Sequence, residues 1–172
     1  MATDFLGPYA ADNYAAVQPA FPKGVGFIVP GTCPVLANPT AADTYGLCWV
    51  PAGFTCTGGI MWASDIDTGT EALDIDIGWK ANGGSGTYDT VDTDGLGNLG
   101  VWNGDAFATG NINVVSSNVY VFAGAFLSAG IWPAFTRKTL IRAYCNVTAN
   151  AFTAGRISVN VFGFVDPSIA VG

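Results

Sequence analysis

The sequence predicts an all-β fold: a single β-sandwich, jelly-roll-like, preceded by an irregular, proline-rich N-terminal arm. Short segments place apolar residues at every second position, as strands with one buried face do. Gly- and Asn-rich turns separate these segments, and no window combines a 3.6-residue period with helix-capping residues. A length of 172 residues fits one domain. We expect residues 1–44 to form the arm and residues 45–172 to form the sandwich.

The arm is predicted from its prolines, which lack a backbone N–H and favour extended or edge segments over helices and central strands. Aromatic residues stand between them, and such side chains are typical anchors at interfaces. We therefore expect the arm either to reach a neighbouring subunit or to pack on its own domain. The prolines are Pro8, Pro19, Pro22, Pro30, Pro34 and Pro39, and the candidate interface residues are Tyr9, Tyr14, Phe21 and Phe27.

The first predicted strands follow the arm. Residues 47–50 are apolar and end at Pro51-Ala52-Gly53, and residues 54–57 lead through two glycines into residues 60–64. Residues 72–79 alternate strictly, so Ile75 and Ile77 should be buried while Asp74 and Asp76 are exposed.

The second half of the chain contains a long polar segment at residues 81–100, which we expect to be a surface loop. Further strands are predicted at residues 112–115 and 119–123. The two clearest later strands are residues 139–148 and 156–165, both with apolar and polar positions in alternation.

Charge is sparse and acidic. Only 11% of the residues are charged, half are hydrophobic, and the net charge is −7. Binding to the nucleic-acid backbone needs clustered Lys and Arg, so we expect no nucleic-acid partner. A surface with few charges is a liability for a free monomer and suits a subunit of an assembly.

The chain begins without a basic segment followed by an apolar one, and no stretch has the length of a transmembrane helix. We expect synthesis in a reducing cytoplasm, no membrane partner, and buried reduced thiols at Cys33, Cys48, Cys56 and Cys145. The absence of histidine excludes zinc sites that use His and every His-based catalytic triad, and a site of four cysteines is the remaining zinc alternative.

Acidic clusters are the candidates for metal chemistry. Carboxylates in D-x-D spacing can supply two of the six to eight oxygens that calcium takes, but the full calcium-loop signature is missing. Solvated turns explain the same residues, so we expect no cofactor. The calcium candidates are Asp65, Asp67, Asp92 and Asp94.

Enzymatic activity is not expected. Paired carboxylates and a cleft lined by tryptophan could hydrolyse glycosides, and Trp49, Trp62, Trp79, Trp102 and Trp132 could line such a cleft. The alternative is that tryptophans on strands belong to the core or to an interface. The Gly-x-Ser-x-Gly elbow of hydrolases is absent.

Two segments resemble virion proteins of tailed bacteriophages. Residues 50–62, VPAGFTCTGGIMW, resemble a hairpin of the form LPAG-x-x-x-x-GG-hydrophobic in those proteins, and the strand that follows ends at Gly78. Residues 154–166, AGRISVNVFGFVD, resemble the closing strand of the same group. The resemblance covers roughly residues 45–78 and 139–166, and the proline-rich front and the Trp- and Cys-bearing hairpin depart from it.

The resemblance implies a decoration, or cement, protein: a subunit that binds the outside of the capsid and stabilises the shell. It implies the major capsid protein as partner, self-association, for which we expect a homotrimer, and a location on the capsid surface. A tail, neck or head-fibre component is the alternative within virions. A carbohydrate-binding module is the alternative of a different class, because an exposed tryptophan stacks on sugar rings.

Overall fold

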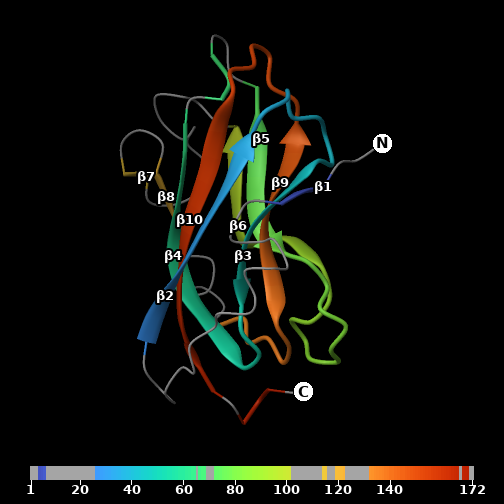
Figure 1. The fold of residues 1–172 in the computed structure, drawn as a ribbon, viewed down its shortest axis with the longest axis vertical. Coiled ribbons are helices and arrows are strands. Elements are labelled where there is room, and N and C mark those ends of the chain that lie inside the picture. Colours follow the sequence, from blue (N-terminus) through green and yellow to red (C-terminus); the bar gives the residue numbers. More distant parts are fainter. Residues whose placement is uncertain are drawn as a thin grey trace.

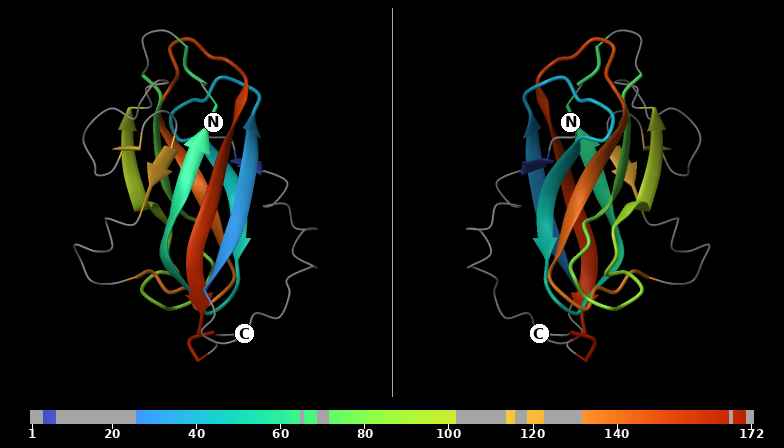
Figure 2. Two further views of the ribbon diagram at one scale, coloured as in Figure 1. Left: turned by 90° about the vertical axis from the view of Figure 1, so that its left-hand side faces the viewer. Right: turned by 90° about the vertical axis from the view of Figure 1, so that its right-hand side faces the viewer.

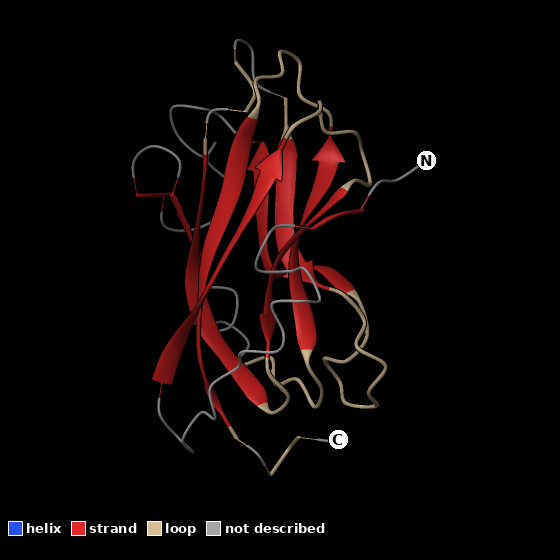
Figure 3. Ribbon diagram, viewed as in Figure 1, coloured by secondary structure: helices blue, strands red, loops and turns tan. Residues whose placement is uncertain are grey.

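Two β-sheets that pack face to face form the structure (Figure 1). In this computed structural model every regular element of the described residues is a strand (Figure 3). Among these residues none belongs to a helix that could cross a membrane. The described residues are 4–6, 26–64, 66–68, 72–101, 114–115, 119–122, 132–166 and 168–170.

Each sheet contains five strands. Sheet A has the order β1-β3-β9-β5-β6, and sheet B has the order β2-β10-β4-β8-β7. Neighbouring strands are antiparallel except β1 and β3, which are parallel. The strands are β1 (Asp4–Leu6), β2 (Gly26–Val35), β3 (Thr44–Val50), β4 (Phe54–Ala63), β5 (Asp74–Trp79), β6 (Asp92–Val101), β7 (Val114–Val115), β8 (Val119–Val121), β9 (Thr139–Val147) and β10 (Gly155–Val165).

The connections between strands are those of a jelly roll. From β2 to β5 each strand lies in the sheet opposite to its predecessor, β5 and β6 form a hairpin in sheet A, and β8, β9 and β10 change sheet again. In the left view of Figure 2 the strands β4, β10 and β2 lie side by side in front, in the order of sheet B. The predicted all-β, jelly-roll-like sandwich is confirmed.

Three predicted segments differ from the structure. Residues 26–35, predicted as part of the arm, form β2 and pair with β10, and Cys33 and Val35 lie in the core. Edge strands tolerate proline because one side of the strand needs no partner, which explains Pro30 and Pro34 here. Residues 92–101 were predicted as loop or left unassigned but form β6 against β5.

The third difference concerns the segment that resembles a phage hairpin. β3 and β4, on either side of Pro51-Ala52-Gly53, belong to different sheets and are not paired with each other. β4 continues through Gly58 and Gly59, and its pairing with β10 shifts register just before them, at Thr57. The turn therefore carries the chain from one sheet to the other, and Gly53 adopts a φ of 78°, which favours glycine.

The core lies between the sheets and is built from the alternating apolar residues of the long strands. Ile75 and Ile77 of β5 are fully buried, as predicted. Gly59 points inward, and a Cβ atom on it would lie 2.1 Å from the ring of Phe122, which is itself buried. The missing side chain of Gly59 thus makes room for an aromatic ring in the core.

Candidate interaction surface

The outer face of sheet B is the most unusual surface of the described structure. On β2 and β10 the inward residues are buried, whereas the outward residues are in most cases exposed or half-buried. Residues opposite one another in the sheet form rows across this face, such as Ile28 with Phe162 and Thr32 with Ser158. We call this surface face B.

Face B carries almost no charge, although the chain as a whole carries −7. Arg156 is the only charged residue on β2, β4 and β10. Apolar side chains and hydroxyl groups make up the rest. The outward side chains are Ile28, Pro30, Thr32 and Pro34 of β2, Arg156, Ser158, Asn160, Phe162 and Phe164 of β10, and Thr57, Ile60 and Trp62 of β4.

One end of face B contains a hollow whose described lining residues carry no charge, and we call it the apolar hollow. It encloses about 350 Å³ and is lined by Gly26, Ile28, Thr57, Phe162 and Gly163. Beside it on β10, Phe164 contacts the edge of Trp132, with ring centroids 6.2 Å apart. Ile28 is 59% exposed and Trp132 is 45% exposed, so large apolar groups face solvent at this end.

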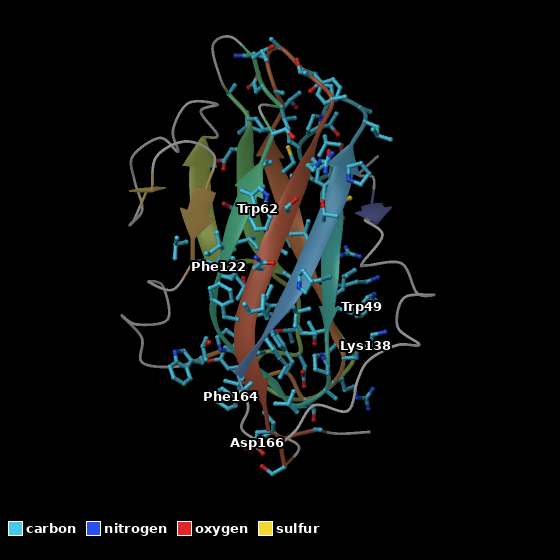
Figure 4. The ribbon with its side chains drawn as sticks, turned by 60° about the vertical axis from the view of Figure 1, so that its left-hand side comes forward. Trp49, Trp62, Phe122, Lys138, Phe164 and Asp166 are labelled. Atoms are coloured by element: carbon cyan, nitrogen blue, oxygen red, sulfur yellow. The ribbon has the colours of Figure 1, made fainter. Side chains whose placement is uncertain are left out.

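The opposite end of face B contains a second hollow, which we call the arginine hollow. It is an open hollow of about 550 Å³, and among its described lining residues the exposed Arg156 is the one that carries a charge. Trp62 and Phe164 mark the two ends of the face (Figure 4). The lining residues of the arginine hollow are Thr32, Pro34, Leu36, Ser64, Ala154, Gly155 and Arg156.

The outer face of sheet A, which we call face A, is different in kind. Asp76, Arg142 and Tyr144 point outward from neighbouring strands, yet each is at most 8% exposed. Asn146 donates a hydrogen bond to Asp76 over 2.5 Å, and the Tyr144 hydroxyl donates to the carbonyl of Trp79 over 2.9 Å. The prediction that Asp76 is exposed is therefore wrong, because its carboxylate is held in a buried hydrogen-bonded network. Asp74 is only half-buried.

Asp67, a calcium candidate, has a structural role. Its carboxylate accepts hydrogen bonds from the backbone N–H groups of Ala72, Leu73 and Ala151 over 2.7 to 3.0 Å, and the residue is fully buried. Burial alone would raise the pKa of Asp67, but the backbone donors outweigh it and hold the pKa below its usual value. The carboxylate joins two loops, and Asp65 lies outside the described residues.

Asp89 belongs to the acidic residues of the predicted loop, although it is not one of the four calcium candidates, and it has the same role in the loop after β5. It accepts hydrogen bonds from Asn82, from the N–H of Gly86, and from both the N–H and the hydroxyl of Thr136. Burial acts to raise the pKa of Asp89, and these donors lower it more. A polar segment with an Asp, an Asn and several glycines was the only sequence signal for this network.

The two other calcium candidates, Asp92 and Asp94, lie at the start of β6. Burial and the neighbouring carboxyl of Asp94 raise the pKa of Asp92. Asp67 and Asp92 flank opposite ends of β5, which are roughly 16 Å apart along the strand. The four candidates thus do not form one site, and the described residues contain no cluster of three or more His, Cys, Asp or Glu.

The cysteines are poor candidates for metal or redox chemistry. All four are buried thiols in the structure. Burial raises the pKa of Cys56 and of Cys145 to about 12, and that of Cys48 further. Because the thiolate is the reactive and metal-binding form, these thiols are chemically quiet at neutral pH.

The aromatic candidates divide into three groups. Tyr9, Tyr14 and Phe21 lie outside the described residues, as does the side chain of Phe27, so their predicted interface role stays a prediction. Trp79 is buried in the core. Trp49 lies on the side of sheet A, where the Lys138 ammonium sits 4.5 Å from its ring centroid (Figure 4), and Trp62 and Trp132 belong to face B.

The alternation in the sequence predicted the buried face of β10, and no role was predicted for the residues on its opposite face. Alternation placed Ile157, Val159 and Val161 on a common face, and these residues are buried. The same alternation places Phe162 and Phe164 on the opposite face. Two phenylalanines and one arginine on the solvent side of a strand were the available signal for face B.

The structure resembles chains in two phage capsid structures. One is the capsid of Ralstonia phage GP4, with a TM-score of 0.60, 16% identity, and coverage of 95% of this chain and 99% of that chain. The other is the capsid asymmetric unit of cyanophage Pam1, with a TM-score of 0.51, 16% identity, and coverage of 88% and 96%. Both matches span most of each chain, so the similarity concerns the fold as a whole and not a single motif.

Comparisons based on the sequence give no match. No protein-family model matches this chain. No curated protein matches it either.

Proposed function

We propose that this chain is a structural protein of a tailed-phage particle that binds the outside of the capsid and stabilises the shell, as a decoration protein does. The observation that carries the proposal is the full-length fold similarity to chains in two phage capsid structures. The matched chains are of similar size to this one, because each match covers most of both chains. A single small jelly roll is an architecture used in viral capsids.

The apolar hollow and its Trp132–Phe164 pair are the proposed contact with the shell. Aromatic anchors in desolvated pockets dominate the energy of most protein interfaces. This end of face B exposes Ile28 and Trp132, and β2, β4 and β10 carry no carboxylate, although Asp166 follows β10 directly. A protein that binds the expanded shell better than its precursors stabilises it by mass action. The proposed partner is the major capsid protein.

The test uses particles that lack the wild-type chain and variants that keep the fold. Ile28→Glu places a charge in the apolar hollow at a position that is 59% exposed. Burying that charge against the shell should weaken co-sedimentation with particles at least tenfold. Val91→Glu is the matched control, because Val91 is 57% exposed and precedes β6 on sheet A. Equal attachment of the two variants would contradict the proposed contact.

Copy number separates the decoration role from a tail, neck or head-fibre role. A protein that covers the capsid surface should be present at hundreds of copies per particle, and a neck or tail component at about a dozen, as symmetric assemblies of those kinds require. Quantitative staining of purified particles measures this directly. We also propose a homotrimer, which light scattering of the purified chain tests. A copy number near a dozen would favour the neck or tail.

A further inference from the structure

We propose that the arginine hollow binds an acidic sugar, a hexuronic acid unit of a surface polysaccharide. The inference rests on the proposed function in one respect: a chain on the outside of a particle meets such polymers in solution. The hollow itself is defined by the geometry of β2, β10 and the end of β4. Three groups of different chemistry converge there, and together they match the three parts of a uronic acid.

The guanidinium of Arg156 would bind the carboxylate of the uronic acid. Arginine keeps its charge at any relevant pH and presents a planar fork of donors that fits a carboxylate with two hydrogen bonds. Arg156 is exposed and is the only charged residue on the three strands that form this part of face B. Because the side chain of Arg156 is exposed, a carboxylate from outside the chain can reach its guanidinium.

The hydroxyl groups match the hydroxyls of a sugar. Thr32 Oγ1 and Ser158 Oγ lie 3.0 Å apart in one row of the face, and Ser64 Oγ accepts a hydrogen bond from the backbone N–H of Arg156 over 3.2 Å. Each hydroxyl can both donate and accept, as the hydroxyls of a sugar ring do. Thr32 and Ser64 line the hollow directly.

The apolar border matches the C–H face of a pyranose ring. Trp62 neighbours Ser158 across the sheet and lies two residues before Ser64 on β4, and it is 36% exposed. Leu36, which is 75% exposed, lies among the lining residues of the hollow. An exposed indole beside hydroxyls and a cation offers a stacking platform for the sugar.

The two ends of face B can be occupied at the same time. Arg156 and Phe164 are eight residues apart on β10, which corresponds to roughly 25 Å along the strand. A chain that contacts the shell through the apolar hollow therefore leaves the arginine hollow open. This separation makes the two proposals independently testable.

The experiment titrates the purified full chain with trigalacturonic acid and with its methyl ester, followed by amide chemical shifts or calorimetry. The ester keeps the rings and removes the charges. We expect saturable binding of the acid, at least tenfold weaker binding of the ester, and at least tenfold loss in both Arg156→Gln and Trp62→Leu. Lys80→Gln is the matched control, because it removes an exposed cation that lies outside face B.

Three results would overturn the inference. The first is no binding of the acid, and the second is equal binding of acid and ester with Arg156→Gln unaffected. The third is that glutarate, a carboxylate without sugar rings, binds as tightly and is indifferent to Trp62→Leu. Particle attachment separates this failure from failure of the proposed function: Arg156→Gln should still co-sediment with particles. If it does not, the hollow belongs to the shell contact and the sugar site is rejected.

Discussion

The outer faces of the two sheets use polar and apolar residues in opposite ways. Face A contains ionisable side chains that point outward and are nevertheless buried, among them Asp76 and Arg142. Face B contains apolar side chains that point outward and are exposed, among them Ile28 and Trp62. In an isolated sandwich the usual arrangement is an apolar interior and a solvated polar exterior on both sheets.

The difference between the two faces distinguishes side chains that stabilise the subunit from side chains that are free to contact a partner. The buried carboxylate of Asp76 and the hydroxyl of Tyr144 on face A have hydrogen-bond partners within the chain. Apolar groups on face B have no such need of one another for folding, because the core lies on the other side of the same strands. Face A thus serves the stability of the subunit, and face B is the surface that a partner would cover.

The largest expected effect is the difference in stability between a charge placed in the core and the same charge placed on face B. Ile77→Asp places a charge in the fully buried core and should destabilise the fold by about 3–5 kcal/mol. Ile28→Asp makes the same chemical change on face B and should cost less than about 0.5 kcal/mol. Thermal melts of both variants measure this. A large loss in Ile28→Asp would mean that face B is part of the core of the subunit.

The second effect concerns the buried carboxylates that join loops. Asp67→Ala removes the acceptor for three backbone N–H groups and should cost about 2–4 kcal/mol at neutral pH. Asp76→Ala serves as the comparison on face A. A loss no larger than that of an exposed loop residue such as Thr68→Ala would show that water replaces the carboxylate.

The lowered pKa values of these buried carboxylates predict how the stability of the fold changes at acidic pH. Asp67 and Asp89 have pKa values below that of an unfolded aspartate, so their stabilisation is complete above the ordinary value of about 3.9. It is lost as the pH falls through the lowered native pKa values. The melting temperature should therefore change little between pH 7 and pH 5 and fall below about pH 4. The deficit of Asp67→Asn relative to wild type should shrink over the same acidic range.

The sequence predicted the architecture because the long strands carry strict alternation. The predicted segments 72–79, 139–148 and 156–165 correspond closely to β5, β9 and β10, which hold the centre of both sheets. In these strands each inward residue is apolar, and apolar residues at every second position indicate a strand with one buried face. The fold class followed from these strands without information on how they pair.

The predicted turns and loops were wrong where a glycine or a proline lies within a strand and has a packing role. Gly95 lies in β6, and a Cβ atom there would lie 2.4 Å from the ring of Trp79, so close approach of the ring demands glycine. Gly59 accommodates Phe122 in the same way. Local patterns cannot distinguish such positions from turns, because the ring that occupies the space comes from a distant part of the chain.

The candidate site was only partly predictable for a related reason. The sequence predicts that tryptophans on strands belong to the core or to an interface but not which of them are exposed, and Trp62 and Trp132 lie exposed on face B. The convergence of Arg156 with Thr32 and Ser64 depends on three strands from separate parts of the sequence. Such a cluster is created by sheet order, which no single segment encodes.

A third effect, smaller than the first two, tests the network on face A. Asp76→Asn keeps the shape of the side chain and removes its charge, next to Asn146 and within a residue that is 4% exposed. We expect a loss of about 1–2 kcal/mol, because a hydrogen bond to a charged acceptor is replaced by a weaker one. Chemical denaturation with unchanged slope measures it. A neutral result would mean that the carboxylate is solvated in spite of its burial.

The smallest expected effect is the counterpart on face B. Thr32 Oγ1 lies 3.0 Å from Ser158 Oγ and 3.2 Å from the carbonyl of Ile157, so Thr32→Val removes polar contacts while the shape is kept. We expect less than about 1 kcal/mol, since Thr32 is only half-buried and the bond joins two neutral hydroxyls, although Ser158 itself is buried. Chemical denaturation beside Asp76→Asn gives the comparison. If Thr32→Val costs as much as Asp76→Asn, the hydroxyls of face B also hold the subunit together, and the two faces do not divide stability from binding.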